Sequence, residues 1–157
     1  MVVARETPVG YMLEHGFKAL VTLEIDPDIS FWEKTVKPPG LDGGEKIDIT
    51  TMHNLLWKTY AAQKLMEATD MTGTCAYAPE VLEQIKSVIN VATMVWIMFS
   101  DGDYWGIPGF LRMFDPQEIQ IGQQPEASYT ISFTNRHPTT KAELGPTWSG
   151  NTGTGTG

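Results

Sequence analysis

One stretch restricts the fold of this chain more than any other: residues 31–54, FWEKTVKPPGLDGGEKIDITTMHN. Pro38 and Pro39 each fix φ and lack a backbone N–H, so a regular strand ladder cannot run through them. The glycines that follow are Gly40, Gly43 and Gly44. They permit backbone angles that are closed to other residues. This composition predicts a long, ordered excursion between two strands, and loops of this kind tend to carry function.

Length and charge limit the classes of protein to consider. A chain of 157 residues predicts one domain, which can bury roughly 68–70% of its extended surface. Its 19 acidic against 11 basic residues, a net charge of −8, disfavour phosphate-mediated binding of nucleic acid. The single cysteine, Cys75, excludes an internal disulfide framework. The first ten residues lack the apolar region of a secretion signal, and we expect a soluble protein made in a cytoplasm.

Most of the chain has the hydrophobic pattern of β-strands. Alternation of apolar and polar residues predicts half-buried strands at residues 17–25 and 128–134. The nearly uninterrupted apolar run at residues 91–99 predicts a strand that is buried on both faces. A hairpin at residues 100–103 and a return strand at residues 104–114 should follow, with a bulge or bend at the glycines and proline of the latter. Further strands are predicted at residues 31–36, 46–51, 55–60 and 71–77, whereas residues 61–70 fit either a short helix or a loop.

A single helix is predicted at residues 79–90. Pro79 suits a first helical position, and Asn90 suits a C-terminal stop. The apolar positions form one stripe at helical spacing: Val81, Leu82, Ile85, Val88 and Ile89. The fold class is therefore mainly β: two packed β-sheets, as a sandwich or partial barrel, with one flanking α-helix and a long extended loop. We place an N-terminal arm at residues 1–16, the β domain at 17–146, and a flexible Gly/Thr-rich tail at 147–157.

No pattern in the sequence predicts catalysis, a cofactor or a metal. The three histidines, His15, His53 and His137, lack the spacing of a shared ligand set. Residues 40–46 lack the Gly-Lys-Ser/Thr of a phosphate loop, and the Asp pairs at 26/28 and 101/103 fit turns better than a calcium loop. Cys75 falls in a predicted strand and is expected to be buried. The five tryptophans fit a sugar platform less well than core and interface roles.

The stretch at residues 31–54, followed by Trp57, resembles the corresponding stretch of tail tube (major tail) proteins of long-tailed bacteriophages. Weaker matches follow in the same order along the chain: residues 76–79 and the helix, residues 122–127, Thr134-Asn135 with Pro138, and residues 143–146. One departure is Ala78, where an Asp that caps the helix is expected, and this puts the cap in doubt.

The resemblance implies a fold of two packed β-sheets with one helix on the flank. It also implies a structural virion protein whose homo-hexameric rings stack into a hollow tail tube for genome delivery. Its other partners would be further tail proteins, such as terminator, tape measure and baseplate components, while DNA passes through the lumen without specific binding. The protein would be made in the bacterial host cytoplasm and would reside in the virion. The family has no catalytic residues, so the resemblance implies no enzyme.

The long excursion is the expected interface with neighbouring copies, because an arm can reach contacts that close a ring and contacts that extend a filament. The residues assigned to this subunit interface are Trp32, Pro38, Pro39, Gly40, Leu41, Asp42, Gly43, Gly44 and Trp57. We expect the two tryptophans near the roots of the arm. The alternatives are another ring-forming virion protein (connector, terminator or decoration) and a β-sandwich carbohydrate-binding module.

Overall fold

The computed structural model describes residues 20–27, 29, 31–99 and 103–149 of the chain. The predicted N-terminal arm at residues 1–16 and most of the predicted tail lie outside these residues. The elements are β1 (Leu20–Leu23), β2 (Phe31–Lys37), β3 (Leu41–Asp42), β4 (Ile47–Asp48), β5 (Tyr60–Ala61), β6 (Glu67–Ala68), β7 (Met71–Tyr77), α2 (Val81–Val88), β8 (Thr93–Met98), β9 (Tyr104–Pro116), β10 (Glu126–Phe133) and β11 (Thr147–Ser149). Among the described residues, no helix is long and apolar enough to cross a membrane.

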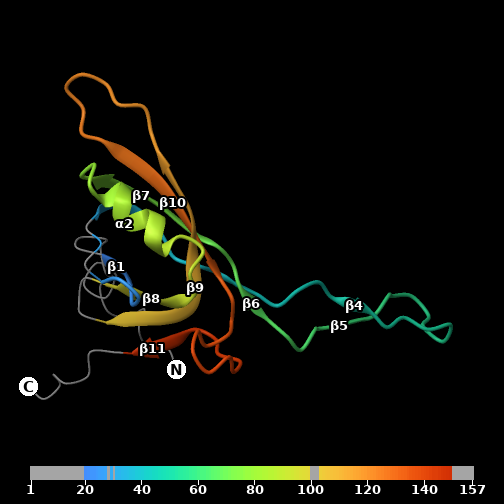
Figure 1. The fold of residues 1–157 in the computed structure, drawn as a ribbon. Coiled ribbons are helices and arrows are strands. Elements are labelled where there is room, and N and C mark those ends of the chain that lie inside the picture. The colour runs from blue at the N-terminus through green and yellow to red at the C-terminus, as the bar shows by residue number, and fades with distance from the viewer. Residues whose placement is uncertain (1–19, 28, 30, 100–102, 150–157) are drawn as a thin grey trace, which may run out of the picture.

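One antiparallel sheet of seven strands forms the body of the molecule. Its strand order is β1-β8-β9-β10-β7-β2, and β11 pairs with the start of β9. The sheet is curled (Figure 1), and its two end strands, β1 and β2, are therefore in contact. There the backbone N–H of Val21 in β1 donates a 2.8 Å hydrogen bond to the carboxylate of Glu33 in β2. The body is therefore a partial barrel, closed at its seam by a side chain.

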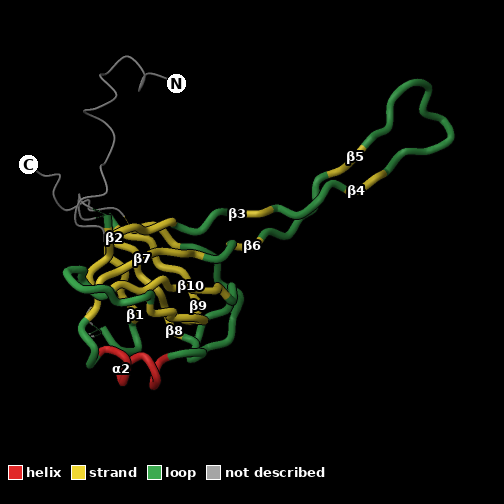
Figure 2. Tube along the Cα trace, turned by 90° about the horizontal axis from the view of Figure 1, so that it is seen from above, coloured by secondary structure: helices red, strands yellow, loops and turns green. Residues whose placement is uncertain are grey.

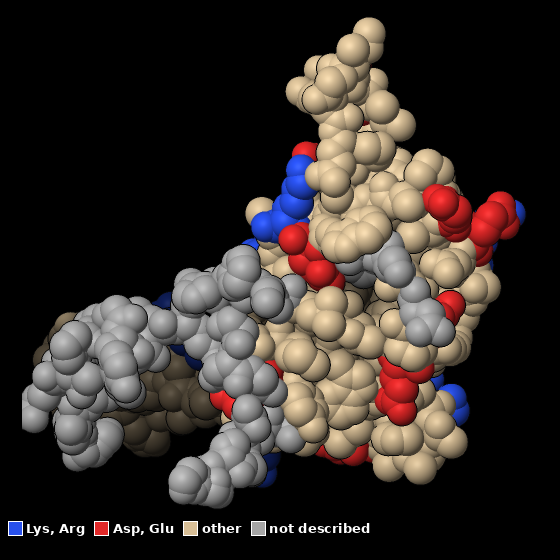
Figure 3. Space-filling model, turned by 90° about the vertical axis from the view of Figure 1, so that its left-hand side faces the viewer, with Lys and Arg blue, Asp and Glu red and all other residues tan. Residues whose placement is uncertain are grey.

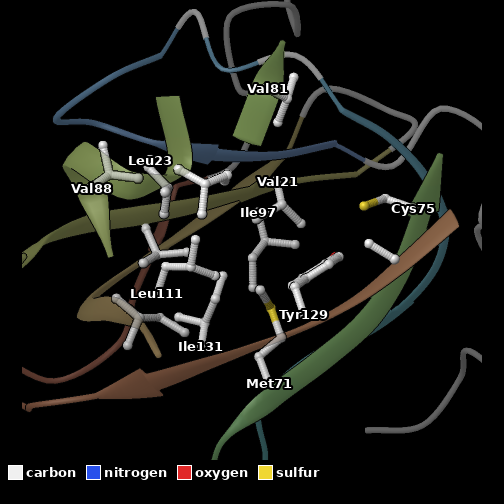
Figure 4. Close-up of a cluster of buried hydrophobic side chains, with 14 of the residues drawn as sticks. Val21, Leu23, Met71, Cys75, Val81, Val88, Ile97, Leu111, Tyr129 and Ile131 are labelled. Atoms are coloured by element: carbon white, nitrogen blue, oxygen red, sulfur yellow. The ribbon is translucent and has the colours of Figure 1, made fainter. Parts of the chain in front are cut away.

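The concave side of the curled sheet holds the core. Figure 4 shows side chains from β1, β7, β8, β9 and β10 converging there. The largest fully buried side chains are those of Tyr129, Met71, Ile97, Ile107, Leu111, Ile131 and Val95. Each strand contributes alternate residues, as the period of two requires. This one apolar cluster stabilises the sheet.

Helix α2 covers one end of the core through Val81, Ile85 and Val88, which are buried. It lies on the flank of the strands (Figure 2). No side chain caps its N-terminus, as the Ala78 departure suggested. Asn90 ends the helix with a positive φ of 62°, and its N–H donates to the carbonyl of Leu111 at 2.9 Å.

The mainly β class with one flanking helix is confirmed, as are the strand at residues 71–77 and, nearly to the residue, the strand at 31–36. The structure differs from the expectation of two packed sheets in the place of its smaller sheets. The two smaller sheets, β3-β6 and β4-β5, belong to the excursion rather than to the core. The predicted strand at residues 55–60 is wrong, because residues 55–59 form turns and irregular loop. At the C-terminal end, the sheet extends into the predicted tail through β11.

Strand β9 bends strongly between its two halves (Figure 1). The glycines allow close packing on its two sides: the indole of Trp96 lies over Gly106, and Phe133 lies against Gly109. The irregularity in pairing itself falls later than expected, where the register with β10 shifts between Thr130 and Ile131. The glycines therefore give aromatic side chains room, and the bulge forms beyond them.

We expect Gly106→Ala to destabilise the fold by about 1–3 kcal/mol, because the new Cβ would lie 2.3 Å from Trp96 Cζ3. Urea unfolding measures the change. The control is Gly145→Ala, which meets no heavy atom within 4 Å and should change stability by less than about 0.5 kcal/mol. Equal stability of the two variants would contradict the close packing.

The Glu33 seam predicts a pH-dependent stability. Burial raises the pKa of Glu33 above its ordinary 4.5, against the opposing hydrogen bond from Val21. The contribution of Glu33 to the free energy of unfolding is therefore complete below the pKa that Glu33 has in the unfolded chain. It is lost as the pH rises through the higher pKa that Glu33 has in the folded protein. Glu33→Gln keeps the acceptor oxygen without the charge. Its free energy of unfolding, measured by urea unfolding over a pH series, should rise relative to that of the wild type as the pH increases above the ordinary pKa of 4.5. An equal pH dependence of the two proteins would contradict the role of Glu33 at the seam.

Candidate subunit interface

Residues 38–70 leave the sheet between β2 and β7 and project far from the body as a long hairpin, which we call the arm (Figures 1 and 2). Two short antiparallel ladders hold its two sides together. Leu41–Asp42 pairs with Glu67–Ala68 near the body, and Ile47–Asp48 pairs with Tyr60–Ala61 farther out. The arm is therefore an ordered extension of the connection between β2 and β7 rather than a loose loop.

The arm has no core of its own. Every residue from 40 to 67 is exposed except Asn54 and Ala61, which are half-buried. Of the 20 exposed large hydrophobic residues within the described part of the chain, ten lie on the arm, so apolar exposure is concentrated there. These ten are Leu41, Ile47, Ile49, Met52, Leu55, Leu56, Trp57, Tyr60, Leu65 and Met66. An exposed apolar surface on this scale marks an interaction site.

Polar groups set the shape of the arm tip, residues 49–59. Asn54 is central: its Oδ1 accepts from the Thr51 N–H at 3.0 Å, and its Nδ2 donates to the Trp57 carbonyl at 2.8 Å. Thr59 N–H donates to the Thr50 hydroxyl at 2.9 Å, and hydrogen bonds from Thr50 lower the pKa of Asp48. The backbone polar groups thus find partners within the tip.

The large apolar side chains of the tip, in contrast, are exposed to solvent. Met52 is 99% exposed, Leu55 95% and Trp57 80%. A folded tip normally turns such groups inward. Here the polar groups are satisfied inside and the apolar groups face outward, which is the arrangement of a surface that binds an apolar partner.

The middle of the arm is fixed by contacts between its two sides. Gln63 Nε2 donates to the Glu45 carbonyl at 2.8 Å, and Lys46 Nζ lies 3.9 Å from the ring centroid of Tyr60. Gly44 has φ = 81°, and a Cβ there would lie 2.9 Å from Gln63 Oε1. The positive φ favours glycine at this position, and a larger residue would also displace the Gln63 amide from its hydrogen bond to Glu45.

The root of the arm is joined to the sheet. Gly40 N–H donates to the Thr69 hydroxyl at 2.8 Å, and Thr69 N–H donates to the Gly40 carbonyl at 2.9 Å. Pro39 is buried, whereas Pro38 is exposed. The two prolines therefore end β2 and fix the point at which the arm leaves the body.

An open hollow of about 430 Å³ lies beside this root, and we call it the root hollow. It forms between the arm, β9, β11 and the segment that leads into β11. Its apolar lining comes from Leu65, Met66, Trp105, Leu144, Pro146 and Trp148. It has the size of a site that holds side chains or a small ligand.

The predicted interface residues fall in four places. Pro38, Pro39 and Gly40 lie at the root, and Leu41, Asp42, Gly43 and Gly44 lie on the proximal half of the arm. Trp32 lies on β2 of the body, where it is 59% exposed. Trp57 was expected near a root of the arm, and this placement is wrong, because it lies at the tip.

Trp57 lies at the tip because the arm is longer than the sequence pattern suggested. Residues 46–51 alternate as a core strand would, but they do not return to the sheet, and only Ile47–Asp48 pairs. The prediction also missed Met52, Leu55, Leu56, Leu65 and Met66 as interface candidates. Leu55-Leu56-Trp57 within a segment of otherwise polar residues is the signal that could have indicated them.

The described residues contain no group of three or more His, Cys, Asp or Glu side chains that could hold a metal ion. Cys75 is fully buried, and burial raises the pKa of its thiol to about 12. A thiol in this environment is a poor nucleophile. The buried cysteine of the sequence prediction is therefore confirmed.

Asn54→Ala should loosen the tip without weakening the body, because the hydrogen bonds it removes all lie within residues 51–59. We expect faster amide exchange over residues 49–59 by at least about fivefold, which corresponds to the loss of about 1 kcal/mol of local stability. The midpoint of urea unfolding should stay within error of the wild type. Exposed Lys58→Ala is the control and should leave exchange unchanged; equal exchange in Asn54→Ala would contradict the central role of Asn54.

No protein-family model and no curated protein matches this sequence. Solved structures do match. A chain from the virion of a native gene transfer agent particle is 14% identical, with a TM-score of 0.56, over 78% of this chain and 95% of that one. A chain from the six-fold symmetrised baseplate of the anti-feeding prophage is 12% identical, with a TM-score of 0.58, over 92% and 97% of the two chains. A chain from the sheath-tube complex of an extracellular contractile injection system, PVC, in the extended state is 13% identical, with a TM-score of 0.56, over 96% and 99%. This chain therefore has the fold of chains in tails and tail-like injection systems, as its resemblance to tail tube proteins implies.

Proposed function

We propose that this chain is a structural virion protein whose hexameric rings stack into a hollow tail tube for genome delivery. The arm is its main means of contact with neighbouring copies. Neither enzymatic activity nor a cofactor is part of this function. The protein is made in the cytoplasm of a bacterial host and becomes part of the virion.

The arm carries this proposal. Ten large apolar side chains are exposed on an ordered hairpin, so the arm is built for a partner that the single chain does not supply. Its reach from residue 38 to residue 54 is at most roughly 50 Å, at ~3.3 Å per residue. The radius of gyration of a domain of about 100 residues is only ~13 Å. The arm can therefore extend across an adjacent subunit.

Symmetric self-assembly is the simplest use of such an arm. A heterologous contact repeated around an axis closes into a ring, and one repeated along an axis extends a filament. The solved structures that share this fold come from a tail-bearing particle, a baseplate with six-fold symmetry and a sheath-tube complex. Six subunits in a ring agree with the six-fold symmetry of that baseplate. The other partners in this proposal are further tail proteins, such as terminator, tape measure and baseplate components.

The acidic charge suits a conduit for DNA. With a net charge of −8, the subunit repels a polyanion within about one Debye length, ~8 Å at physiological salt. DNA can then pass through the lumen without specific binding.

The alternatives predict different observations. A connector, terminator or decoration protein would form rings or coats but not long tubes, so the length distribution of assemblies distinguishes it. A carbohydrate-binding module would need neighbouring exposed aromatics. The exposed tryptophans Trp32, Trp57 and Trp148 are distributed over β2, the arm tip and β11, and half-buried Trp105 pairs with Trp148 at the root hollow. Shifts of tryptophan fluorescence across a panel of glycans would therefore indicate a carbohydrate-binding module.

Replacement of residues 42–67 by Asn-Gly should leave a folded body that no longer assembles. The cut preserves the Gly40–Thr69 hydrogen bonds and buried Pro39, which a deletion of residues 38–45 alone would remove. Circular dichroism and urea unfolding should match the wild type. In negative-stain microscopy the wild type should show rings and tubes, whereas the variant should show neither.

A matched control keeps the arm and changes its charge: Lys58→Gln at the exposed tip should still assemble. Tubes formed by the armless variant would show that the arm is dispensable. A wild type that remains monomeric at high concentration and physiological salt would overturn the tail tube function itself.

A further inference from the structure

Strand β9 joins two apolar features at opposite ends of the body. Its first residues, including Trp105, border the root hollow, and its last residue, Pro116, leads into the loop at residues 117–125. The strand has 13 residues, so these features are separated by up to roughly 40 Å along it. In Figure 1 the loop lies at the top of the body, while β11, whose Trp148 lines the root hollow, lies at the bottom.

The loop at residues 117–125, which we call the apical loop, is held in shape by hydrogen bonds. Gln117 N–H donates to the Glu126 carbonyl at 2.8 Å, and Gln123 N–H donates to the Gln120 carbonyl at 3.1 Å. Gly122 adopts a φ of 82°, which supports the turn. The loop is thus a fixed projection of the β9–β10 hairpin.

The apical loop presents two aliphatic side chains to solvent. Ile119 is 66% exposed and Ile121 is fully exposed. Glu118 is the only charged residue of the loop, and four glutamines make up much of the rest. In Figure 3 the projecting end at the top of the molecule is almost free of charged atoms. The two isoleucines can therefore enter an apolar site without burying a charge, whereas the glutamine amides must stay in water or find hydrogen-bond partners.

The root hollow offers an apolar lining for these two isoleucines. It is open, measures about 430 Å³ and is lined mainly by aliphatic and aromatic side chains. Its wall also carries Lys64, Glu67 and Glu143, and Lys64 is the side chain that can face Glu118 of an incoming loop. Asn135, also on the wall, can bond to loop backbone.

We propose that the apical loop of one copy inserts Ile119 and Ile121 into the root hollow of a second copy. The contact joins the two ends of the body, so each subunit presents a free loop at one end and a free hollow at the other. Such a head-to-tail contact, repeated along the tube axis, extends a filament rather than closing a ring. This inference rests on the proposed tube function and assigns the stacking of rings to the apical loop and the root hollow, with the arm supplying further contacts.

The loop is a better occupant of the hollow than an arm tip. The hollow adjoins the root of the arm. The arm leaves the body sideways, whereas the loop lies at the far end of the β9–β10 hairpin from β11 (Figure 1). The loop also brings two aliphatic side chains, which the hollow can enclose. The arm tip brings the larger set of Met52, Leu55, Leu56 and Trp57.

The first test uses the full-length double variant Ile119→Ser/Ile121→Ser. Both residues are exposed, so the fold should persist, which circular dichroism checks. The protein concentration at which tubes appear in sedimentation and negative-stain microscopy should rise by at least about tenfold, because two buried aliphatic side chains are lost at every contact. Leu82→Ser on α2, also an exposed aliphatic position, is the control and should assemble like the wild type.

The second test identifies the occupant of the hollow. Ile121→Cys and Met66→Cys proteins are mixed, assembled and treated with a short bismaleimide, while buried Cys75 stays unmodified. A cross-linked 121–66 dimer supports the proposal, and Leu82→Cys in place of Ile121→Cys should give none.

The possible outcomes test the loop-to-hollow contact separately from the tube function. Wild-type tubes together with normal assembly of the double serine variant would overturn the loop-to-hollow contact and leave the tube function standing. Cross-linking of Trp57→Cys rather than Ile121→Cys to Met66→Cys would assign the hollow to the arm tip and also overturn the contact. A strictly monomeric wild type would overturn the tube function and the contact with it.

Discussion

The fold depends on the curling of one antiparallel sheet around a single apolar cluster. Val95, Ile97, Ile107 and Tyr129 reach full burial only because the strands at the two ends of the sheet approach each other. A flat sheet of the same strands would leave one face of this cluster in water, and a small core cannot tolerate that loss. Glu33 connects the two end strands through the Val21 N–H, and α2 covers the remaining opening. The arm and the apical loop project from this closed body.

The arm follows a different physical rule from the body. Its stability comes from short ladders, the Asn54 hydrogen bonds and glycine geometry, since almost none of its side chains are buried. The body is complete without it, and its root is joined to the sheet by the Gly40–Thr69 pair. This separation explains how one chain can hold a compact core and still expose a large apolar surface. Under the proposed function, this exposed surface is the interface with neighbouring copies.

Sequence patterns predicted the elements that face the core, because burial imposes a period on them. The strand at residues 71–77 and the helical stripe of Val81, Ile85 and Val88 are examples. The patterns failed in the arm. Residues 46–51 alternate, but no core lies beneath either face, so alternation there carries no information on pairing with the sheet. The length of the arm, and thus the position of Trp57 at its tip, depends on contacts between residues such as Gln63 and Glu45 that no local pattern reveals.

The internal hydrogen bonds of the arm tip have a consequence for the thermodynamics of association. A segment that orders only on binding loses its conformational entropy at that step, and its affinity falls accordingly. In this chain the tip takes its shape when the subunit folds, because Asn54 and Thr50 organise the backbone before any partner is present. Each docking step then retains more of the free energy of apolar burial. Preorganisation in the monomer would therefore let this acidic subunit form long-lived contacts through a slender hairpin.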